Sequence, residues 1–340
     1  MKKLIRHTGI VLSTLILIGI IVWYNYISHA VPSSSAITPD SLARLQQQYQ
    51  QSLNDFRAET NQKLGNLWDQ VLLTSFRLPD TLYFCGQRVP LWRQIVRDKI
   101  ELELFRFARQ RHNLVIWYKR QGRYFPFIEQ TLRDMGLPDD LKYVVVLESQ
   151  LNPKARSGKG AGGLWQFMLL TGANYGLKKN GIIDQRLDPW LATRAAGLHL
   201  IDLYQLSKNY QEQGDWPLAL AQYVCKESTV RLAIKAAGHK DYFTLNLPPD
   251  GERYAPQVLA LKIILSQPHA FGLDLFEQYP PLPEPSDTLI SLPHGGTVKS
   301  LADSAGISLD EFTLLNTSYL VPHVPPGTYQ VKKIAQIQAD

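Results

Sequence analysis

The chain has 340 residues, of which 45% are apolar, and its formal net charge is +6 at pH 7. This length is sufficient for one sizeable globular core with smaller appendages, and the apolar fraction excludes a disordered chain. The positive charge favours anionic surroundings such as a polyanionic polymer or lipid headgroups. No nucleic acid is expected as a partner, because acidic residues interrupt the basic residues between positions 88 and 123.

The N-terminus has a basic start followed by an apolar stretch from Gly9 to Ile27. About nineteen such residues can just cross a bilayer as a helix, and the basic flank should stay in the cytoplasm. Residues 1–30 are therefore predicted to be a cytoplasmic start and a transmembrane anchor, with the rest of the chain exported. A removable signal peptide is the alternative, because Ser28-His29-Ala30 resembles a small-residue cleavage site.

Residues 31–84 are predicted to form a linker and an amphipathic helix. Pro32 to Pro39 is a short serine-rich linker. From Ser41 to about Phe76, apolar residues recur at every third or fourth position, which favours a helix lying on its own domain over a coiled coil.

Helical periodicity continues through most of the chain. Between Pro90 and Asp134 the predicted segments are separated by His112-Asn113, Gln121-Gly122 and Pro126. Later helices are predicted at Leu164 to Tyr175, Leu191 to Gln205, Trp216 to Val224, Thr229 to Ala237 and Tyr254 to Leu265. The body of the protein is therefore predicted to be mainly α.

A run of prolines from Pro280 to Pro285 is a stiff spacer and marks a predicted domain boundary. A compact β-α-α-β module is predicted after it. Its predicted elements are a strand at Thr288 to Leu292, a helix at Thr297 to Ala305, a second helix that begins with a capping box of Ser308 and Glu311, and a last strand at Tyr329 to Val331.

Glu148 ends the apolar run at 141–147. Pro138 and the acids after it predict a helix start, so Glu148 is placed on a helix although the valines would also suit a strand. On that helix Val144 and Val145 share a face with Glu148, which directs the carboxyl group toward the core.

Burial would give Glu148 the property that cleavage of a glycosidic bond requires. The leaving oxygen needs a proton, whereas free glutamate, with a pKa of about 4.3, is almost wholly ionised at neutral pH. Apolar neighbours penalise the charged form and raise the pKa. A solvated helix glutamate is the structural alternative.

A glycine-rich segment from Gly158 to Gly163 follows, and then the pair Trp165-Gln166. The segment does not fit a phosphate-binding loop, because Lys159 is followed by Gly160 rather than by Ser or Thr. Glycine lets the backbone approach a ligand closely, and an aromatic residue beside an amide favours sugar binding. The alternatives are a flexible surface loop and a core tryptophan.

Many short motifs in this region match one family in order. They are Leu137-Pro138, Leu147-Glu148-Ser149, Asn152-Pro153, Ala155, Ser157, Ala161, Gly163-Leu164-Trp165-Gln166-Phe167, Thr171-Gly172, Tyr175-Gly176-Leu177, Asp184-Gln185-Arg186-Leu187-Asp188-Pro189, Thr193, Ala195-Ala196, Asp215-Trp216 and Tyr254-Ala255-Pro256. On these residues the sequence from Tyr124 to about Leu275 resembles the lytic transglycosylases with a goose-lysozyme-like catalytic domain, in particular the membrane-bound murein transglycosylase D group.

The resemblance implies that Glu148 is the sole catalytic carboxyl. It would protonate the bond between N-acetylmuramic acid and N-acetylglucosamine in peptidoglycan, and then accept a proton from the muramyl C6 hydroxyl as a 1,6-anhydro ring closes. Neither a cofactor nor a metal is implied. The predicted substrate-binding residues are Ser149, Gly163, Trp165, Gln166, Tyr223 and Tyr254.

Two segments depart from the family pattern. Gln222-Tyr223-Val224-Cys225-Lys226 stands where the family usually has Ala-Tyr-Asn-x-Gly, and Asp250-Gly251-Glu252 replaces Glu-Thr-Arg. Losing an amide that hydrogen-bonds an acetamido group could cost about 1–3 kcal/mol. A catalytically degenerate peptidoglycan-binding protein is therefore an alternative, and so is a lysozyme-type hydrolase of the same fold.

The terminal module at 286–333 carries a second set of family-like residues, which are Gly295, Thr297, Leu301-Ala302, Gly306-Ile307-Ser308, Leu315-Asn316 and Pro326-Gly327. On these residues the module resembles a LysM domain, which in its family binds glycans that contain N-acetylglucosamine, although Gly296 replaces the usual aspartate. A purely structural cap is the alternative. Cys85 and Cys225 match no metal or redox spacing, and a disulfide between them is left open.

Together these observations predict a lysozyme-like catalytic domain at 85–280 with a LysM-like module at 286–333. The predicted function is lytic cleavage of peptidoglycan by an enzyme of the bacterial cell envelope. A single-pass inner-membrane anchor would hold the catalytic domain in the periplasm, where tethering raises the local concentration at the wall.

Overall fold

The structure is a computed structural model that describes residues 44, 47–60, 62–63, 78–210 and 214–335. The chain divides into two compact units, Met1–Gln70 and Val71–Asp340. In the first unit, residues 47–60 are helical, as the amphipathic pattern predicts. The predicted anchor at 1–30 lies outside the described residues, and no helix within the described ranges has the length and hydropathy to span a bilayer.

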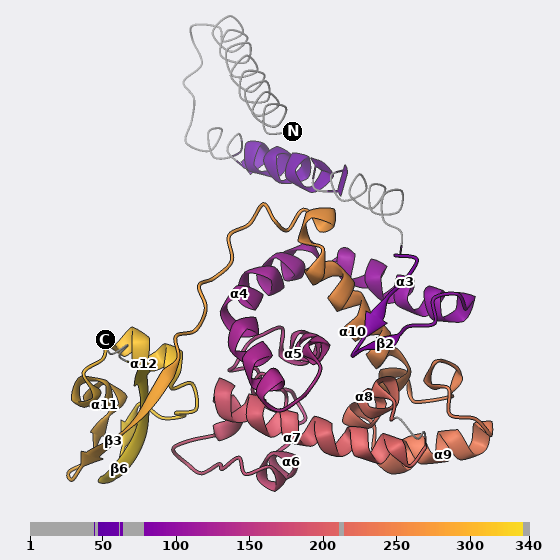
Figure 1. Ribbon diagram of the computed structural model, residues 1–340. Helices are drawn as coiled ribbons and strands as arrows, with labels where there is room; N and C mark the ends of the chain where they lie inside the picture. The colour runs from indigo at the N-terminus through magenta and orange to yellow at the C-terminus, as the bar shows by residue number, and fades with distance from the viewer. Residues whose placement is uncertain (1–43, 45–46, 61, 64–77, 211–213, 336–340) are drawn as a thin grey trace, which may run out of the picture. The chain divides into compact units, whose positions relative to one another are not determined.

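The second unit is built mainly of helices, which confirms the predicted fold class (Figure 1). A two-residue hairpin, β1 (Tyr83–Phe84) with β2 (Gln87–Arg88), precedes the first helix of this unit. The longer helices are α3 (Gln94–Ala108), α4 (Arg111–Asp134), α5 (Lys142–Ser149), α7 (Pro189–Lys208), α8 (Trp216–Val224), α9 (Glu227–Ala237) and α10 (Pro249–Ser266).

Helix α5 lies in the middle of α4, α7, α8 and α10 (Figure 1). It contacts α4 on one side and α10 on another. Tyr143, Val144, Val145 and Val146 are all buried in these contacts, so almost every face of this short helix is covered. The apolar run at 141–147 therefore forms a central helix because neighbouring helices surround it, although its valines favour strands.

Helix α4 is continuous, so the predicted breaks at Gln121-Gly122 and Pro126 are wrong. Gly122 is a packing position: a Cβ atom there would lie 2.6 Å from Gln278 Cβ and 2.7 Å from the Tyr279 carbonyl oxygen. The glycine lets the later segment lie against the helix, and this tertiary contact outweighs the local helix-breaking tendency of glycine and proline.

The helix predicted at Leu164 to Tyr175 is much shorter in the structure. Only α6 (Leu169–Asn174) is helical, and the residues before it form a turn in which Gly162 pairs with Phe167. Gly163 and Gln166 have φ angles of 83° and 48°, which are incompatible with a right-handed helix. The 3₁₀-helix η2 (Gln185–Leu187) then leads into α7.

The C-terminal module has the predicted β-α-α-β order. Strands β3 (Pro285–Leu292) and β6 (Gly327–Ile334) pair antiparallel along their full length, and α11 (Val298–Ala305) and α12 (Leu309–Leu315) pack on them. A second pair, β4 (Gly296–Thr297) with β5 (His323–Val324), was not predicted. The C-terminal module has a small core of its own, formed by Ile290, Leu301, Ala302, Phe312, Val324 and Val331.

The capping box occurs on the other helix of the module. Thr297 and Ser300 exchange hydrogen bonds at the start of α11. At α12 the Ser308 side chain accepts from the Glu311 N–H, but Glu311 Oε1 instead accepts from the Ile334 N–H at 3.3 Å. The Glu311 carboxylate therefore binds the backbone of β6 instead of the start of α12, where the capping box was predicted.

The proline-rich spacer and the module are both hydrogen-bonded to the helical body. Tyr279 N–H donates to the Lys119 carbonyl and Leu282 N–H to the Arg123 carbonyl, so the spacer runs along α4. Ile183 pairs with Tyr319 in an isolated β-bridge that joins the segment before α7 to the module.

Candidate functional site

Glu148 occupies the last turn of α5. The helix ends at Gln150, which adopts the left-handed conformation with φ 56°, and Leu151 follows at φ 57°. Val144 and Val145, on the same face as Glu148, are fully buried, while the Glu148 side chain itself is half-buried. The carboxyl group is thus presented at the edge of the core, as the helical periodicity predicts.

Burial raises the pKa of Glu148 to about 7, from an ordinary value of 4.5. Taking the carboxylate out of water penalises its charged form, and this effect is larger than the opposing one of a hydrogen bond from Tyr254. Tyr254 Oη donates this bond to Glu148 Oε1 across 106 residues of sequence. A carboxyl group with this pKa is partly protonated at neutral pH, which suits a general acid.

Tyr223 and Tyr254 form a stacked pair beside the carboxyl group. Their ring centroids are 6.2 Å apart, with an interplanar angle of 25°. Tyr254 comes from α10 and Tyr223 from α8, and Tyr223 Oη donates to the Trp165 carbonyl oxygen at 2.7 Å. Burial and the nearby Glu148 carboxyl raise the pKa of both phenols well above the ordinary value of 10, so both remain hydrogen-bond donors.

The glycine-rich loop is held by a buried ion pair. Arg186 binds both carboxylate oxygens of Asp184, at 3.0 and 2.8 Å, and both residues are almost fully buried. Arg186 Nη1 also donates to the carbonyl oxygens of Gly160, at 2.7 Å, and Phe167, at 2.9 Å. The guanidinium group therefore connects the two ends of the loop and limits its movement.

Gly163 is required by this packing. Its φ of 83° disfavours other residues, and a Cβ atom would lie only 1.7 Å from the Arg186 carbonyl oxygen. Gly163 thus lets the loop backbone pack directly against the backbone of Arg186. The sequence predicted a different reason for a glycine here, namely close approach of the backbone to a ligand.

Trp165 and Gln166 differ in their placement. Trp165 is fully buried and its indole N–H donates to Thr193 Oγ1 at 2.9 Å, so its ring has a packing role instead of the predicted sugar contact. Gln166 is half-buried and donates to the carbonyl oxygens of Ala155 and Gly163, which leaves its side-chain oxygen without a bond from the described residues.

Ser149 lies next to Glu148 but is buried. Its hydroxyl donates to the Val145 carbonyl of its own helix at 3.1 Å. The hydroxyl keeps lone pairs that can accept a further bond. Of the predicted site residues, the structure therefore brings Glu148, Tyr223 and Tyr254 into one cluster, with Trp165 joined to it through its carbonyl.

The sequence analysis missed three polar residues next to this cluster: Tyr175, His199 and Asp202. His199 packs its ring against Tyr223 at a centroid distance of 5.3 Å, and it also contacts Tyr175. His199 and Asp202 are three residues apart on α7, a spacing that puts them on one helix face. That spacing could have identified His199 and Asp202, whereas Tyr175 stands in the Tyr175-Gly176-Leu177 motif of the family resemblance.

Gly251, which departs from the family pattern, contacts Cys225, which stands at the variable position x of the other segment. A Cβ atom on Gly251 would lie 2.5 Å from Cys225 Sγ, so the glycine makes room for the cysteine. Both Cys225 and Cys85 are free thiols, and no disulfide joins them. Val224, at the position where the family has asparagine, has 38% of its surface exposed.

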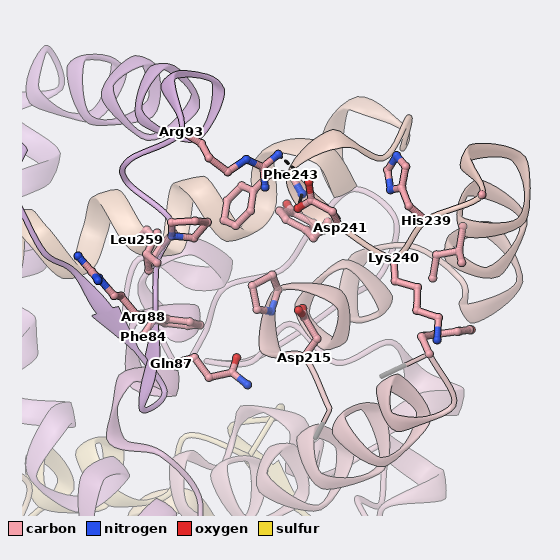
Figure 2. A pocket seen from close by; sticks show the side chains of 17 residues that line it. Phe84, Gln87, Arg88, Arg93, Asp215, His239, Lys240, Asp241, Phe243 and Leu259 are labelled. Atoms are coloured by element: carbon pink, nitrogen blue, oxygen red, sulfur yellow. Dashed lines mark hydrogen bonds and ion pairs between the residues drawn. The ribbon is translucent and has the colours of Figure 1, made fainter. Parts of the chain in front are cut away.

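A cavity of about 950 Å³ lies away from Glu148, between the β1–β2 hairpin and the segment after α9 (Figure 2). Phe84, Phe243 and Leu259 give it an apolar wall, while Asp241 on its rim is paired with Arg93 at 2.7 Å. Glu148, Tyr223 and Tyr254 are not among its lining residues. Within the described ranges, no three His, Cys, Asp or Glu side chains are grouped as a metal site.

Comparison with known proteins supports the resemblance found in the sequence. Residues 125–246 match the family model described as Transglycosylase SLT domain. Two relatives, each a membrane-bound lytic murein transglycosylase D from a strain of Escherichia coli, are 32% identical to the chain over 225 residues. The match covers 64% of this chain and 48% of each relative, so the chain spans about half the length of these relatives.

Among solved structures, an inactive mutant of the lytic transglycosylase Slt from Pseudomonas aeruginosa matches with a TM-score of 0.31 and 20% sequence identity. This match covers 42% of the chain and 24% of the Slt chain. The predicted resemblance to lytic transglycosylases is confirmed by the family model and by the relatives.

Proposed function

We propose that the protein is a lytic transglycosylase that cleaves the β-1,4 bond between N-acetylmuramic acid and N-acetylglucosamine in peptidoglycan. The observation that carries the proposal is the half-buried Glu148, whose pKa of about 7 lets it hold a proton near neutral pH. The match of residues 125–246 to the Transglycosylase SLT domain supports the same reaction class.

In the proposed reaction, protonated Glu148 first donates its proton to the glycosidic oxygen, and the bond from that oxygen to muramyl C1 breaks. The N-acetylglucosamine end leaves as an alcohol, and positive charge develops at C1. The Glu148 carboxylate then accepts the proton of the muramyl C6 hydroxyl while O6 attacks C1. The 1,6-anhydro ring forms, Glu148 is protonated again, and no water is consumed.

A single carboxyl group fits this reaction better than hydrolysis by two carboxylates. Only burial and the hydrogen bond from Tyr254 shift the pKa of Glu148, with no contribution from a second carboxylate among the described residues. Glycoside hydrolases that use two carboxyl groups place them about 5–9.5 Å apart, where they influence each other. The C6 hydroxyl can replace the second group because it belongs to the substrate.

The surrounding residues have supporting roles in this proposal. Tyr254 stabilises the carboxylate that forms after the first proton transfer, and Tyr223 holds Tyr254 by ring stacking. Gln166 presents its free side-chain oxygen to the glycan, and the Ser149 hydroxyl accepts a bond through its remaining lone pairs. Gly163 keeps the loop closed so that these groups stay in place.

The reaction is tested by mass spectrometry of products released from purified sacculi. Fragments that end in 1,6-anhydromuramic acid support the proposal, hydrated reducing ends would indicate a hydrolase, and no fragments would indicate a binding protein. Glu148→Gln should abolish release while glycan binding persists. Glu101→Gln, which changes a carboxyl group on α3, is the matched control and should release fragments at the normal rate.

The proposal extends to location and to glycan binding by the terminal module. Residues 1–30 are proposed to anchor the protein in the inner membrane with the catalytic domain in the periplasm, because a basic start precedes about nineteen apolar residues. The module at 286–333 is proposed to bind the glycan like a LysM domain. Fractionation of cells should recover the full-length chain with membranes, whereas a soluble, shortened chain would indicate a cleaved signal peptide.

A further inference from the structure

His199 lies on α7 with its ring inside an aromatic cluster. The ring centroid is 5.0 Å from Tyr175, 5.3 Å from Tyr223 and 6.1 Å from Phe167. The side chain is only half-buried, so part of the ring faces solvent. A histidine with this environment has two nitrogens whose roles are set by their neighbours.

The hydrogen bonds around His199 determine which nitrogen carries the proton. Tyr175 Oη donates its single hydrogen to Asp202 Oδ2 at 2.8 Å, because an ionised carboxylate can only accept. Tyr175 Oη can therefore only accept from His199 Nδ1, which lies 3.0 Å away. Nδ1 must carry the hydrogen, and in the neutral ring Nε2 is left as an acceptor. Burial supports this neutral form, since it lowers the pKa of His199 to about 4.

Nε2 has no partner among the described residues, and it is accessible. The one hydrogen bond of His199 within the described chain is made by Nδ1. The buried polar atoms that lack a partner are Trp117 Nε1, Gln121 Oε1 and Gln222 Oε1, and Nε2 of His199 is not among them. Since Nε2 has no partner and is not in this set, it is at least partly exposed to solvent.

The acceptor lies close to the candidate acid. Tyr223 is in ring contact with His199 and also with Tyr254, which donates a hydrogen bond to Glu148. Two ring-to-ring steps thus separate His199 from the residue that binds the carboxyl group, with centroid separations of 5.3 and 6.2 Å. A glycan of several sugar rings is long enough to span both steps.

We propose that His199 is a substrate-binding residue whose Nε2 accepts a hydrogen bond from a hydroxyl or an acetamido N–H of a sugar next to the bond that is cleaved. The inference rests on the proposed function, because it assigns a glycan to the surface beside Glu148. Tyr175 and Asp202 are positioning residues that fix the ring and its tautomer. A histidine that only fills the core would not need an accessible acceptor.

The test is binding of a tetrasaccharide of alternating N-acetylglucosamine and N-acetylmuramic acid to full-length protein that carries Glu148→Gln, so that nothing is cleaved. His199→Phe keeps the ring stacking and removes the acceptor, and it should weaken binding about fivefold, the factor expected for one hydrogen bond. His199→Gln places an amide oxygen near the Nε2 position and should restore most of the affinity. His199→Asn reaches only the Nδ1 position and should behave like His199→Phe.

His239, on the rim of the separate cavity (Figure 2), provides the matched control. His239→Gln should bind the tetrasaccharide as tightly as the parent protein. Equal losses in all three His199 variants would overturn the proposal, because they would indicate ring packing instead of an acceptor. Unchanged affinity in His199→Phe would also overturn it.

Nitrogen NMR of histidine-labelled protein gives a second readout that does not depend on catalysis. The spectrum should show the Nδ1–H tautomer for His199, and the Nε2 resonance should move when the tetrasaccharide is added. An Nε2–H tautomer in the free protein would contradict the assignment. If the wild-type protein releases no anhydro product while His199→Phe still weakens binding, the proposed reaction fails and the binding inference stands.

Discussion

Glu148 and Tyr254 form a pair in which each group changes the properties of the other. The carboxyl group is held partly neutral by burial, whereas the phenol stabilises its charged form through a hydrogen bond. A residue that must first donate and then accept a proton needs both influences, because its two states should differ little in free energy near the working pH. The pH dependence of the protein should therefore report on this pair.

Activity should fall as the pH rises through about 7, because Glu148 then loses the proton that it must donate. Tyr254→Phe removes the bond that lowers this pKa, so the alkaline limb of kcat/KM should move to higher pH even though the maximal rate falls. The profiles are measured with soluble glycan fragments. If the alkaline limb of kcat/KM lies at the same pH in Tyr254→Phe as in the wild type, a group other than Glu148 controls it.

The same pKa predicts a dependence of stability on pH. Because the folded pKa of about 7 exceeds the ordinary value of 4.5, the folded protein holds this proton more tightly than the unfolded chain. The associated stability is full below pH 4.5 and is lost between pH 4.5 and 7, at up to about 1.4 kcal/mol per pH unit. Glu148→Gln carries no charge, so its stability relative to wild type should rise over this range in urea unfolding. A constant difference would contradict the predicted pKa.

At the scale of elements, α8 and α10 meet where Cys225 faces Gly251. The glycine is a departure from the family pattern, and the structure gives its reason, since a side chain would overlap the cysteine sulfur. The departure at Gly251 is therefore explained by its contact with Cys225, and it does not by itself indicate that the site has degenerated.

Gly251→Ala should destabilise the protein by about 1–3 kcal/mol, the usual cost of overpacking. Cys225→Ala removes the sulfur and makes room for an alanine at position 251. The double variant should therefore lose less stability than the two single variants together, by about 0.5–3 kcal/mol. Urea denaturation of the four proteins measures this coupling. Additive effects would show that the two positions do not contact each other.

The loop between α5 and α6 makes a second prediction at this scale. Gly163→Ala combines an unfavourable φ with overlap on the Arg186 carbonyl, and should cost about 2–4 kcal/mol and reduce activity. Gly160→Ala is the matched control, since its φ of 87° is similar but open space surrounds it. Its cost should stay near 1 kcal/mol, as expected for φ alone. Equal costs would exclude the overlap as the cause.

At the scale of the whole second unit, Lys332 links the terminal module to the start of α7. Its Nζ lies 2.9 Å from Asp188 Oδ2, and both side chains are at least 90% buried. Asp188 also caps α7 by accepting from the N–H groups of Trp190 and Leu191. The module is therefore connected to the helix that carries His199, and the proposed glycan-binding surfaces are held by one network.

Lys332→Met should destabilise this connection by about 3 kcal/mol, because it leaves the Asp188 carboxylate buried without its cation. Adding Asp188→Asn removes that charge and keeps the capping oxygen, so it should recover much of the loss. Lys333→Met is the matched control. Hydrogen exchange of residues 316–320, measured together with urea unfolding, should accelerate only in Lys332→Met. Exchange that does not change would show that the ion pair does not hold the module.

The sequence by itself determined the features that depend on neighbours within a turn or two. Helical periodicity placed Glu148 on a helix with Val144 and Val145 on its buried face, and it gave the bounds of α8 correctly. The mainly α class and the order of the terminal module were predicted for the same reason. Capping, periodicity and turn signals act over short distances and are therefore visible in a single sequence.

Tertiary structure decided the features that depend on residues far apart along the chain. Packing against Gln278 kept α4 continuous through Gly122, and contact with Arg186 put Gly163 in a turn where a helix was predicted. The bond from Tyr254 to Glu148 and the ring contact from His199 to Tyr223 join separate helices. Burial and pKa follow from such contacts, so the sequence could indicate the acid, whereas only the folded chain decided its surroundings.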